Sequence, residues 1–266
     1  MAFCVFNQGY KDPGASFDAV DAVLTPSQWL ADDYWTAIGL MSTPLPTPIE
    51  EDEVIAADRE PIFVTMVNPS IEKGLFFVAR LAEVIGAGHP DIALLIVETR
   101  GTAGMLAQAG LRGGVDLRRH GNVMFSPVVP RPRDIFQPTR VLLVPSVGPE
   151  SSGRVVAEAL SSGIPPLVSE RGGLAESCNG AGFVRPLPAD LTLDTAAPVG
   201  PEAVARWVDV IARLCADESF YARESAKALA AGAIYRRAAL APRYVAFFES
   251  LLSRARPASA GPPSAP

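Results

Sequence analysis

From about residue 60 onward, short apolar runs alternate with longer amphipathic segments. The short runs are rich in β-branched residues and have the length of buried strands, whereas the longer segments repeat their apolar residues at helical spacing. This alternation is typical of successive β-α units, so it predicts an α/β fold with a Rossmann-like, doubly wound parallel sheet. We expect strands at Ile62 to Val67, Ala93 to Val97, Asn122 to Phe125, Val141 to Pro145, Pro166 to Ser169 and Phe183 to Arg185.

The strand pattern stops near residue 200, and three helices are expected after it. The clearest of them carries a stripe of apolar residues three or four positions apart, which is the pattern of a helix packed on a core. Its members are Val204, Trp207, Val208, Ile211 and Leu214. We expect this carboxy-terminal helical stretch to cover the sheet.

Both ends of the chain depart from this pattern. Near the amino terminus one strand is expected at Ala19 to Leu24 and one helix at Ser27 to Ile38, followed by a Pro-rich stretch. A strand without neighbours is not a domain, so we interpret residues 1–60 as the remnant of an amino-terminal acceptor domain plus a linker. We expect the part from Ala19 to Ile38 to be poorly ordered or self-associating, because its strand lacks the sheet it would complete. Residues 254–266 are rich in Pro, Ala, Ser and Gly and predict a disordered tail, which leaves residues 61–253 as the main domain.

Composition excludes several classes of function. Of the 266 residues, 48% are hydrophobic and 20% are charged, as in ordinary globular proteins. The net charge of -6 repels a nucleic-acid backbone, so no nucleic-acid partner is expected. No apolar run approaches the roughly 20 residues that span a bilayer, and the amino terminus lacks the pattern of a signal peptide, so we expect a cytoplasmic protein without a transmembrane segment. The 3 cysteines and 2 histidines are too few and too scattered for a disulfide framework or a metal site.

Candidate chemistry lies at the carboxyl ends of two predicted strands. In the common strand order 3-2-1-4-5, ligands bind where the connections change direction, beyond strands 1 and 4. The loop after strand 1 ends in Lys73 and Gly74, and the loop after strand 4 contains Glu150 and leads to Gly153. We expect these loops to face each other, so that Lys73 and a helix N-terminus near Gly153 bind phosphates. Glu158 follows Gly153 by roughly 7.5 Å along a helix, about the distance from a diphosphate to its ribose.

The residues around Glu150 and Glu158 form a longer motif. Pro145-Ser-Val-Gly-Pro-Glu-Ser-Ser-Gly-Arg-Val-Val-Ala-Glu-Ala159 is followed by Gly163-Ile-Pro165 and by Ser169-Glu-Arg-Gly-Gly-Leu-Ala-Glu176. These elements, in this order, strongly resemble the Glu-x7-Glu region of retaining GT-B glycosyltransferases of the glycogen-synthase and sucrose-synthase-like group. The Lys73-Gly74 pair matches the same family, and the resemblance extends over about residues 19 to 250.

This resemblance implies that the chain is the carboxy-terminal half of a GT-B fold. In that family this half binds a nucleoside-diphosphate sugar as donor substrate, an amino-terminal domain binds a glycan or small-molecule acceptor, and transfer retains the anomeric configuration without a cofactor or a bound metal. By resemblance Glu150 contacts the transferred sugar and Lys73 stabilises the leaving phosphate as the catalytic pair, while Glu158 binds the ribose hydroxyls. The other donor contacts implied are Asn68, Val128, Val129, Ser151, Ser152, Gly153, Arg154 and Val155.

Two positions depart from the family pattern. Asn68 stands where the family usually has Arg, which removes one cation from the diphosphate, and Ser152 stands where the family usually has Phe. Structural roles stay open for the three central residues. Glu150 also suits the positive end of a helix dipole, Lys73 also suits an ordinary helix entry, and Glu158 also suits a solvated helix face.

The leading prediction is therefore the donor domain of a retaining hexosyltransferase, whose acceptor domain is missing from this sequence. The second prediction is a non-catalytic nucleotide-sugar-binding module that works with a separate acceptor-binding chain. A third class, a scaffold on a degenerate fold, would be favoured by loss of Lys73 or Glu158, and both are present. The sequence leaves the nucleobase, the sugar, the acceptor and the oligomeric state open.

Overall fold

The computed structural model describes residues 1–11, 17–193 and 198–255. Its main body is a six-stranded parallel sheet in the order β6-β5-β4-β7-β8-β9. The first five strands follow the expected order 3-2-1-4-5 and the sixth extends it beyond β8, which confirms the α/β, Rossmann-like fold. The strands are β4 (Phe63–Val67), β5 (Leu94–Val97), β6 (Val123–Ser126), β7 (Thr139–Val144), β8 (Pro166–Ser169) and β9 (Phe183–Arg185).

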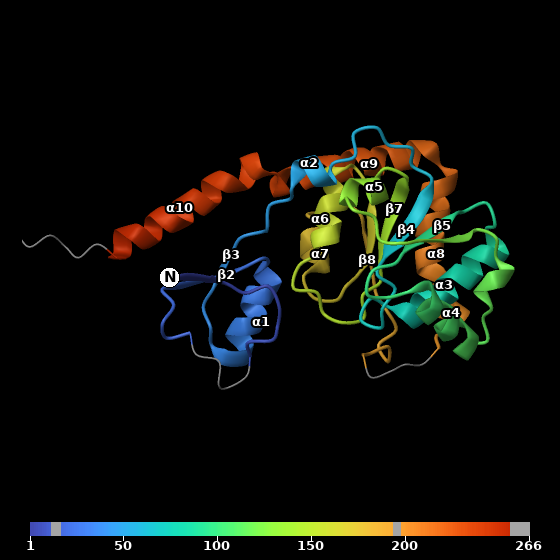
Figure 1. Ribbon diagram of the computed structural model, residues 1–266, viewed down its shortest axis with the longest axis horizontal. Helices are drawn as coiled ribbons and strands as arrows, with labels where there is room; N and C mark the ends of the chain where they lie inside the picture. Colours follow the sequence, from blue (N-terminus) through green and yellow to red (C-terminus); the bar gives the residue numbers. More distant parts are fainter. Residues whose placement is uncertain (12–16, 194–197, 256–266) are drawn as a thin grey trace, which may run out of the picture.

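Alternating side chains of the strands face two separate cores. Val141 and Leu143 of β7 point into one core and Leu142 and Val144 into the other, as the two-residue period of a strand requires. Helices therefore cover both faces of the sheet (Figure 1). The first core lies under α3 (Leu75–Gly88), α4 (Ala103–Arg112) and α8 (Pro201–Ala216), and the second under α6 (Arg154–Ser161) and α9 (Glu218–Gly232). Shorter segments are α5 (Pro132–Phe136), α7 (Leu174–Ser177) and the 3-10 turn η1 (Leu117–Arg119).

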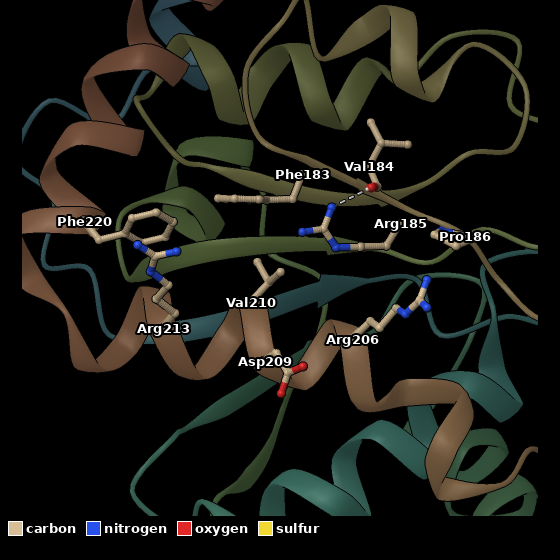
Figure 2. Close-up of a pocket in the computed structure, with 9 residues that line it drawn as sticks. All are labelled: Phe183, Val184, Arg185, Pro186, Arg206, Asp209, Val210, Arg213 and Phe220. Atoms are coloured by element: carbon tan, nitrogen blue, oxygen red, sulfur yellow. Dashed lines mark hydrogen bonds between the residues drawn. The ribbon is translucent and has the colours of Figure 1, made fainter.

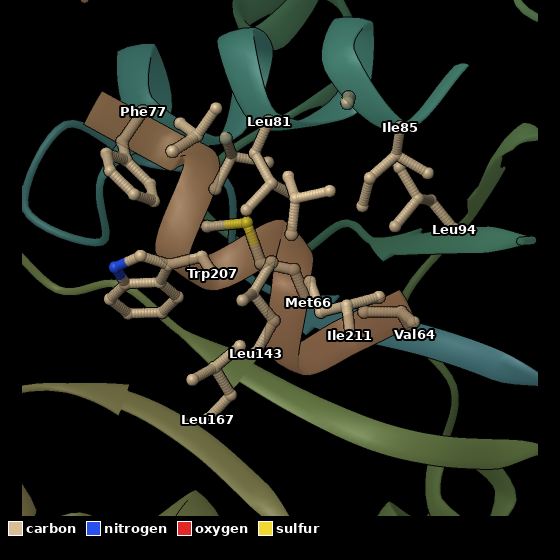
Figure 3. Packing of buried hydrophobic residues seen from close by; sticks show 14 of the residues in the cluster. Val64, Met66, Phe77, Leu81, Ile85, Leu94, Leu143, Leu167, Trp207 and Ile211 are labelled. Atoms are coloured by element: carbon tan, nitrogen blue, oxygen red, sulfur yellow. The ribbon is translucent and has the colours of Figure 1, made fainter. Parts of the chain in front are cut away.

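The first core is centred on the apolar stripe that predicted α8. Trp207 is fully buried, and its ring meets that of Phe77 in α3 edge to face with the centroids 5.1 Å apart. Met66 and Leu143 of the sheet and Ile211 of α8 belong to the same cluster (Figure 3). This packing fixes α8 against α3, the helix that follows the first candidate loop.

A second, smaller sheet lies near the amino terminus, which corrects the expectation of a strand without neighbours. β2 (Ala22–Thr25) lies between β1 (Ala2–Cys4) and β3 (Thr43–Pro44), and both pairings are parallel. Helix α1 (Gln28–Ile38) begins after Ser27, whose hydroxyl accepts a hydrogen bond from the first turn. The expectation of a strand without neighbours was therefore wrong because it missed both partner strands, and the interpretation of residues 1–60 as a domain remnant plus a linker stays a prediction.

Two segments connect the smaller unit, which contains β1 to β3 and α1, with the larger unit, which contains the six-stranded sheet and its helices. The Pro-rich linker leads through α2 (Glu51–Val54) into β4, and α10 (Arg237–Ala255) follows α9 and the 3-10 turn η2 (Ala233–Tyr235). The hydroxyl of Tyr244 in α10 donates to the carbonyl of Pro46 in the linker at 3.1 Å. Helix α10 then extends away from the larger unit (Figure 1).

The start of α10 contacts the acidic segment that begins at Glu50, and its end overlaps the tail expected from residue 254. At its start, Arg237 donates from its side chain to the Glu50 carboxylate at 2.8 Å and from its backbone N–H to the Glu51 carboxylate at 3.0 Å. At its end, the helix continues through Ala255, past the expected start of the tail at residue 254, and residues 256–266 lie outside the described residues.

No helix in the described part of the chain combines the length and the apolarity that crossing a membrane requires.

Candidate functional site

The loops after β4 and β7 lie side by side, as their position at the switch in strand order predicts. The N–H groups of Val147 and Gly148 both donate to the carbonyl of Glu72, at 2.8 and 3.1 Å. Gly74 ends the first loop with a φ of +87°, and a Cβ at this position would stand 2.2 Å from the carbonyl oxygen of Pro145. Glycine is required here because any side chain would push the two loops apart.

Lys73 and Glu150 face each other across this junction. The Lys73 ammonium forms an ion pair with Oε1 of Glu150, and the same oxygen accepts a hydrogen bond from the Ser146 hydroxyl at 2.6 Å. Their side chains are 31% and 19% exposed, so solvent screens the pair less than it screens an ion pair at an open surface. The structure thus brings together the two residues predicted as the catalytic pair, and their catalytic role stays a prediction.

The Gly172-Gly173 turn supports the backbone of Glu150. The N–H of Gly173 donates to the Glu150 carbonyl at 2.7 Å, and Gly172 and Glu150 form an isolated parallel bridge. Gly172 has a φ of +65°, and a Cβ on it would stand 2.3 Å from the Glu150 carbonyl oxygen. The glycine pair therefore lets two backbone segments approach closely and fixes the position of the carboxylate.

Gly153 is the N-cap of α6, the helix whose N-terminus was predicted to bind an anion. A Cβ at Gly153 would lie 2.9 Å from the nearest packed side-chain atom, so no larger residue fits without a shift. The N–H of Gly153 already donates to the Ser177 hydroxyl at 2.8 Å. The following N–H groups, those of Arg154 and Val155, belong to the first helical turn and have no acceptor within the helix. They and the helix dipole make this end of α6 a positive pole.

Glu158 is a buried carboxylate one turn further along α6. Its residue is 7% exposed, and its Oε1 accepts a hydrogen bond from Nε of Arg154 at 2.9 Å. Burial raises the pKa of the Glu158 carboxyl, and the Arg154 guanidinium offsets part of that rise. The carboxylate is therefore held in place by one partner and is largely shielded from water.

These side chains enclose a cavity of about 440 Å³, a size typical of small-molecule sites. An adjoining cavity of about 160 Å³ shares Lys73 and Val155 with it and contains Asn68. Most of the predicted site residues therefore lie on one continuous surface. Those in the wall of the larger cavity are Lys73, Glu150, Ser152, Gly153, Arg154, Val155 and Glu158.

Three predicted donor contacts, Val128, Val129 and Ser151, line neither of these two cavities. Val128 is 66% exposed in the loop after β6, next to Val129, and the carbonyl of Ser151 accepts a hydrogen bond from the Ser27 hydroxyl of the smaller unit. Helix α5 supplies wall residues that the sequence analysis missed, namely Pro132, Ile135 and Phe136. Proline at the first position of α5 is a sequence signal for the start of a helix, but other prolines close by in the sequence make this signal hard to recognise.

Asn68 has a structural task at the smaller cavity. It adopts a φ of +65°, and its side-chain oxygen accepts a hydrogen bond from the N–H of Gly101 at 2.8 Å. A Cβ on Gly101 would stand 2.3 Å from the carbonyl of Pro69, so the loop after β5 packs directly on the loop after β4. Asn68 thus joins two loops of the crevice, and its direct contact with a donor stays a prediction.

The charged side chains of the site form ion pairs. Two ion pairs line the larger cavity, Lys73 with Glu150 and Arg154 with Glu158. Across residues 1–11, 17–193 and 198–255, no cluster of three His, Cys, Asp or Glu side chains is placed to hold a metal ion. The arrangement offers an ammonium and a helix N-terminus to phosphate groups and a buried carboxylate to hydroxyl groups.

Comparisons with known proteins identify the fold. No protein-family model matches the chain, and no curated protein matches it in sequence. Among solved structures, Anabaena Alr3699/HepE in complex with UDP and glucose matches with a TM-score of 0.69 and 16% identity over 94% of this chain and 71% of that chain. The pneumococcal O-GlcNAc transferase GtfA in complex with UDP and GlcNAc matches with a TM-score of 0.68 and 13% identity over 94% of this chain and 52% of that chain.

A third similar structure, sucrose-phosphate synthase from Thermosynechococcus elongatus, has a TM-score of 0.62 and 18% identity over 89% of this chain and 59% of that chain. These neighbours are GT-B glycosyltransferases, so the chain shares the Rossmann-like architecture of that fold. The chain spans between 52% and 71% of the length of the three neighbours.

Proposed function

We propose that this chain is the donor-binding part of a GT-B glycosyltransferase, which transfers a sugar from a nucleoside-diphosphate sugar to a glycan or small-molecule acceptor. The observation that carries this proposal is the cavity in which Lys73, the N-terminus of α6 and Glu158 meet. Further support comes from two structural neighbours, HepE and GtfA, whose structures contain UDP together with a sugar.

We assign each part of the donor to a part of the cavity on the basis of its geometry. The diphosphate lies at the N-terminus of α6, where a negative group gains up to about 2 kcal/mol from the helix dipole, and Lys73 neutralises it from the opposite loop. The ribose hydroxyls donate to the Glu158 carboxylate, roughly 7.5 Å further along the helix. In the described part of the chain, Arg154 engages Oε1 of Glu158, which leaves Oε2 for the ribose.

The transfer step breaks the bond between the anomeric carbon and the diphosphate oxygen and forms a bond from that carbon to the acceptor oxygen. The nucleoside diphosphate leaves with the bonding electron pair, and its leaving oxygen accepts the proton that the acceptor hydroxyl loses. Lys73 and the free N–H groups of α6 stabilise the charge that develops on the leaving oxygen because they are already oriented toward it. Glu150, which Lys73 and Ser146 hold in place, orients the sugar. We propose that transfer retains the anomeric configuration and that Lys73 supplies the positive charge without a metal.

An acceptor-binding domain would extend the smaller sheet. β1 lies at the edge of this three-stranded parallel sheet, and parallel sheets are normally covered by helices on both faces. Trp35 and Met41 of the smaller unit are 58% and 77% exposed, which suits burial against further structure. We propose that such a domain, on the same or a separate polypeptide, binds the acceptor. If this chain only binds the donor and a separate chain binds the acceptor, the alternative function of a non-catalytic nucleotide-sugar-binding module applies.

Thermal unfolding with a panel of nucleoside diphosphates tests donor binding. Binding to the folded state adds about 2.7 kcal/mol to the unfolding free energy at a hundredfold excess of ligand over Kd. We expect at least one nucleotide to raise the Tm of the wild type, a smaller shift for Lys73→Ala, and an unchanged shift for Arg112→Ala, which removes an exposed cation of α4. The absence of any shift at millimolar concentration would refute donor binding.

Radiolabelled nucleotide sugars separate the enzyme from the binding module. Holding the acceptor against the anomeric carbon contributes roughly 7 to 11 kcal/mol to barrier reduction. We expect the chain alone to hydrolyse the donor slowly and to transfer efficiently only with an added acceptor-domain polypeptide. Donor binding without transfer in either mixture would favour the module, and rapid transfer by the chain alone would contradict the division into two halves.

A further inference from the structure

A second cavity lies at the outer edge of the six-stranded sheet. It has a volume of about 500 Å³, and its walls come from β9, α8 and the start of α9 (Figure 2). β9 is the edge strand, separated from β7 by β8. Among the described residues, this cavity and the 440 Å³ cavity of the candidate site have no wall residue in common. It is therefore a separate site, which we name the β9 cavity.

Arginine side chains surround the β9 cavity. Arg185 comes from β9, and Arg206 and Arg213 come from one face of α8 with Asp209 between them (Figure 2). Three guanidinium groups against one carboxylate leave a local charge of +2, whereas the whole chain has a net charge of -6. Such a local excess attracts an anionic ligand.

The described residues contain no ion pair that engages any of these four side chains. Arg185 donates to the carbonyl of Val184 at 3.0 Å, and the Arg213 guanidinium lies 3.9 Å above the centre of the Phe220 ring. The nearby Arg140, in contrast, pairs with a carboxylate at 2.6 Å. Arg185 is therefore held by a backbone carbonyl and Arg213 by stacking on Phe220. Neither forms an ion pair among the described residues, although the Arg213 charge also interacts with the nearby Asp217.

The remaining wall is largely apolar. Phe183 and Phe220 lie with their ring centroids 6.0 Å apart, and Val210 projects from α8 beside them. The volume of about 500 Å³ far exceeds that of an inorganic anion and is in the range of small-molecule sites. The expected ligand therefore has an organic part that packs on these side chains in addition to its anionic group.

We propose that the β9 cavity binds a small organic phosphate monoester. At neutral pH such a group has a charge of about -1.5 to -2, which matches the local excess, and its three oxygens accept hydrogen bonds from more than one guanidinium. The phosphate contacts Arg185 and one of the two arginines of α8, and the organic part packs against Phe183 and Val210. This site is independent of the donor cavity and of the function proposed for it.

Isothermal titration calorimetry with phenyl phosphate tests this site. We expect one-to-one binding to the wild type. The double variant Arg206→Gln, Arg213→Gln should bind with an affinity lower by about 10-fold or more. Arg112→Gln, which removes an exposed arginine of α4, and Lys73→Ala, in the donor cavity, should bind as the wild type does. Asp209→Asn removes the opposing charge and should tighten binding about 3-fold, which tests the site even if the double variant fails to fold.

Three results would overturn the proposal. One is the absence of binding at millimolar concentration. Another is an affinity that neither Asp209→Asn nor the double variant changes. Loss of binding in Lys73→Ala belongs with it, because that loss would locate the anion in the candidate site around Lys73. The third is tighter binding of hexaglutamate than of phenyl phosphate with the same dependence on the arginines, because that would identify an acidic peptide as the partner.

Discussion

Glu158 illustrates how one residue combines burial with a charge. Removal from water favours the neutral form of its carboxyl, whereas the hydrogen bond from Arg154 favours the ionised form. The pKa is raised, so desolvation is the larger effect. An ionised carboxylate that is short of hydrogen-bond donors gains more from a ribose hydroxyl than a solvated one does.

We expect Glu158 to distinguish nucleotides by their ribose hydroxyls. Replacing Glu158 by Gln keeps the size of the side chain but weakens its hydrogen bonds to hydroxyls, so a nucleoside diphosphate should bind about 1.5 to 3 kcal/mol more weakly. The 2′,3′-dideoxy nucleotide should bind the wild type and Glu158→Gln alike, which calorimetric titration measures. Glu249→Gln on α10 is the matched control and should leave both affinities unchanged. A Glu158→Gln variant that still discriminates against the dideoxy nucleotide as the wild type does would exclude the ribose contact.

The same residue predicts a pH dependence of stability. Because the folded-state pKa of Glu158 is above the ordinary value of 4.5, the folded state binds this proton more tightly than the unfolded state does. The stability that this group contributes is therefore fully present below that value and is lost as the pH rises through the folded-state pKa. Urea unfolding at several pH values should show Glu158→Gln gaining stability relative to the wild type as the pH rises across this range. A difference that does not vary with pH would contradict a raised pKa.

Among the elements, the entry to α3 depends on a glycine for two separate reasons. Gly74 has a left-handed backbone, and its missing side chain makes room for the carbonyl of Pro145 in the loop after β7. Gly114, which follows α4, shares the left-handed backbone with a φ of +73° but has no atom within 4 Å of the site of a Cβ. Comparing substitutions at Gly74 and Gly114 therefore distinguishes the cost of a left-handed backbone from the cost of a steric clash.

We expect Gly114→Ala to cost about 1 kcal/mol of unfolding free energy, the usual penalty of a left-handed residue with a side chain. Gly74→Ala should cost clearly more, about 2 to 4 kcal/mol, because two loops must also move apart. Urea unfolding of both variants measures this difference, and a nucleotide titration of Gly74→Ala should show weaker binding. Equal losses in the two variants would mean that the Pro145 contact is relieved without cost.

The elements also show which parts of the fold sequence patterns can predict. Long β-branched runs such as Val141 to Val144 are buried on both faces and were predicted within a few residues, as was their parallel order. β1 and β3 have only 3 and 2 residues, too few for a pattern, and β3 contains Pro44, which cannot donate to a sheet. The facing of Lys73 and Glu150 followed from topology, whereas the arginines of the β9 cavity are scattered in sequence and meet only in the folded chain.

At the scale of the whole molecule, the two units meet at the beginning of α1. The carboxylate of Glu176, in α7 of the larger unit, accepts hydrogen bonds from the N–H groups of Gln28 and Trp29 at 2.7 and 2.9 Å. These N–H groups belong to the first turn of α1, so the larger unit supplies an acceptor that the helix itself lacks. The charge of the carboxylate also interacts favourably with the dipole of α1.

Removing this carboxylate should loosen the contact between the units. In Glu176→Ala the two N–H groups lose charge-assisted hydrogen bonds of about 1.5 to 3 kcal/mol, so their hydrogen exchange should accelerate by about 10-fold or more. Hydrogen–deuterium exchange of the peptide at the start of α1 measures this effect. The strands of the larger sheet should keep their protection, and Glu202→Gln, in the first turn of α8, should leave α1 unchanged. Unaltered exchange at Gln28 and Trp29 would show that Glu176 does not hold α1.

The Ser151 carbonyl joins the smaller unit to the loop after β7. It belongs to the segment between Glu150 and α6, and it accepts the hydroxyl of Ser27 from the smaller unit. If the proposed donor orders this segment, it acts on the same hydrogen bond that any separation of the two units would break. Linkage requires that the factor by which the donor favours the joined arrangement equals the factor by which the joined arrangement favours the donor. A change in donor affinity between the joined and the separated arrangement would therefore equal the shift that donor binding causes in the equilibrium between these arrangements.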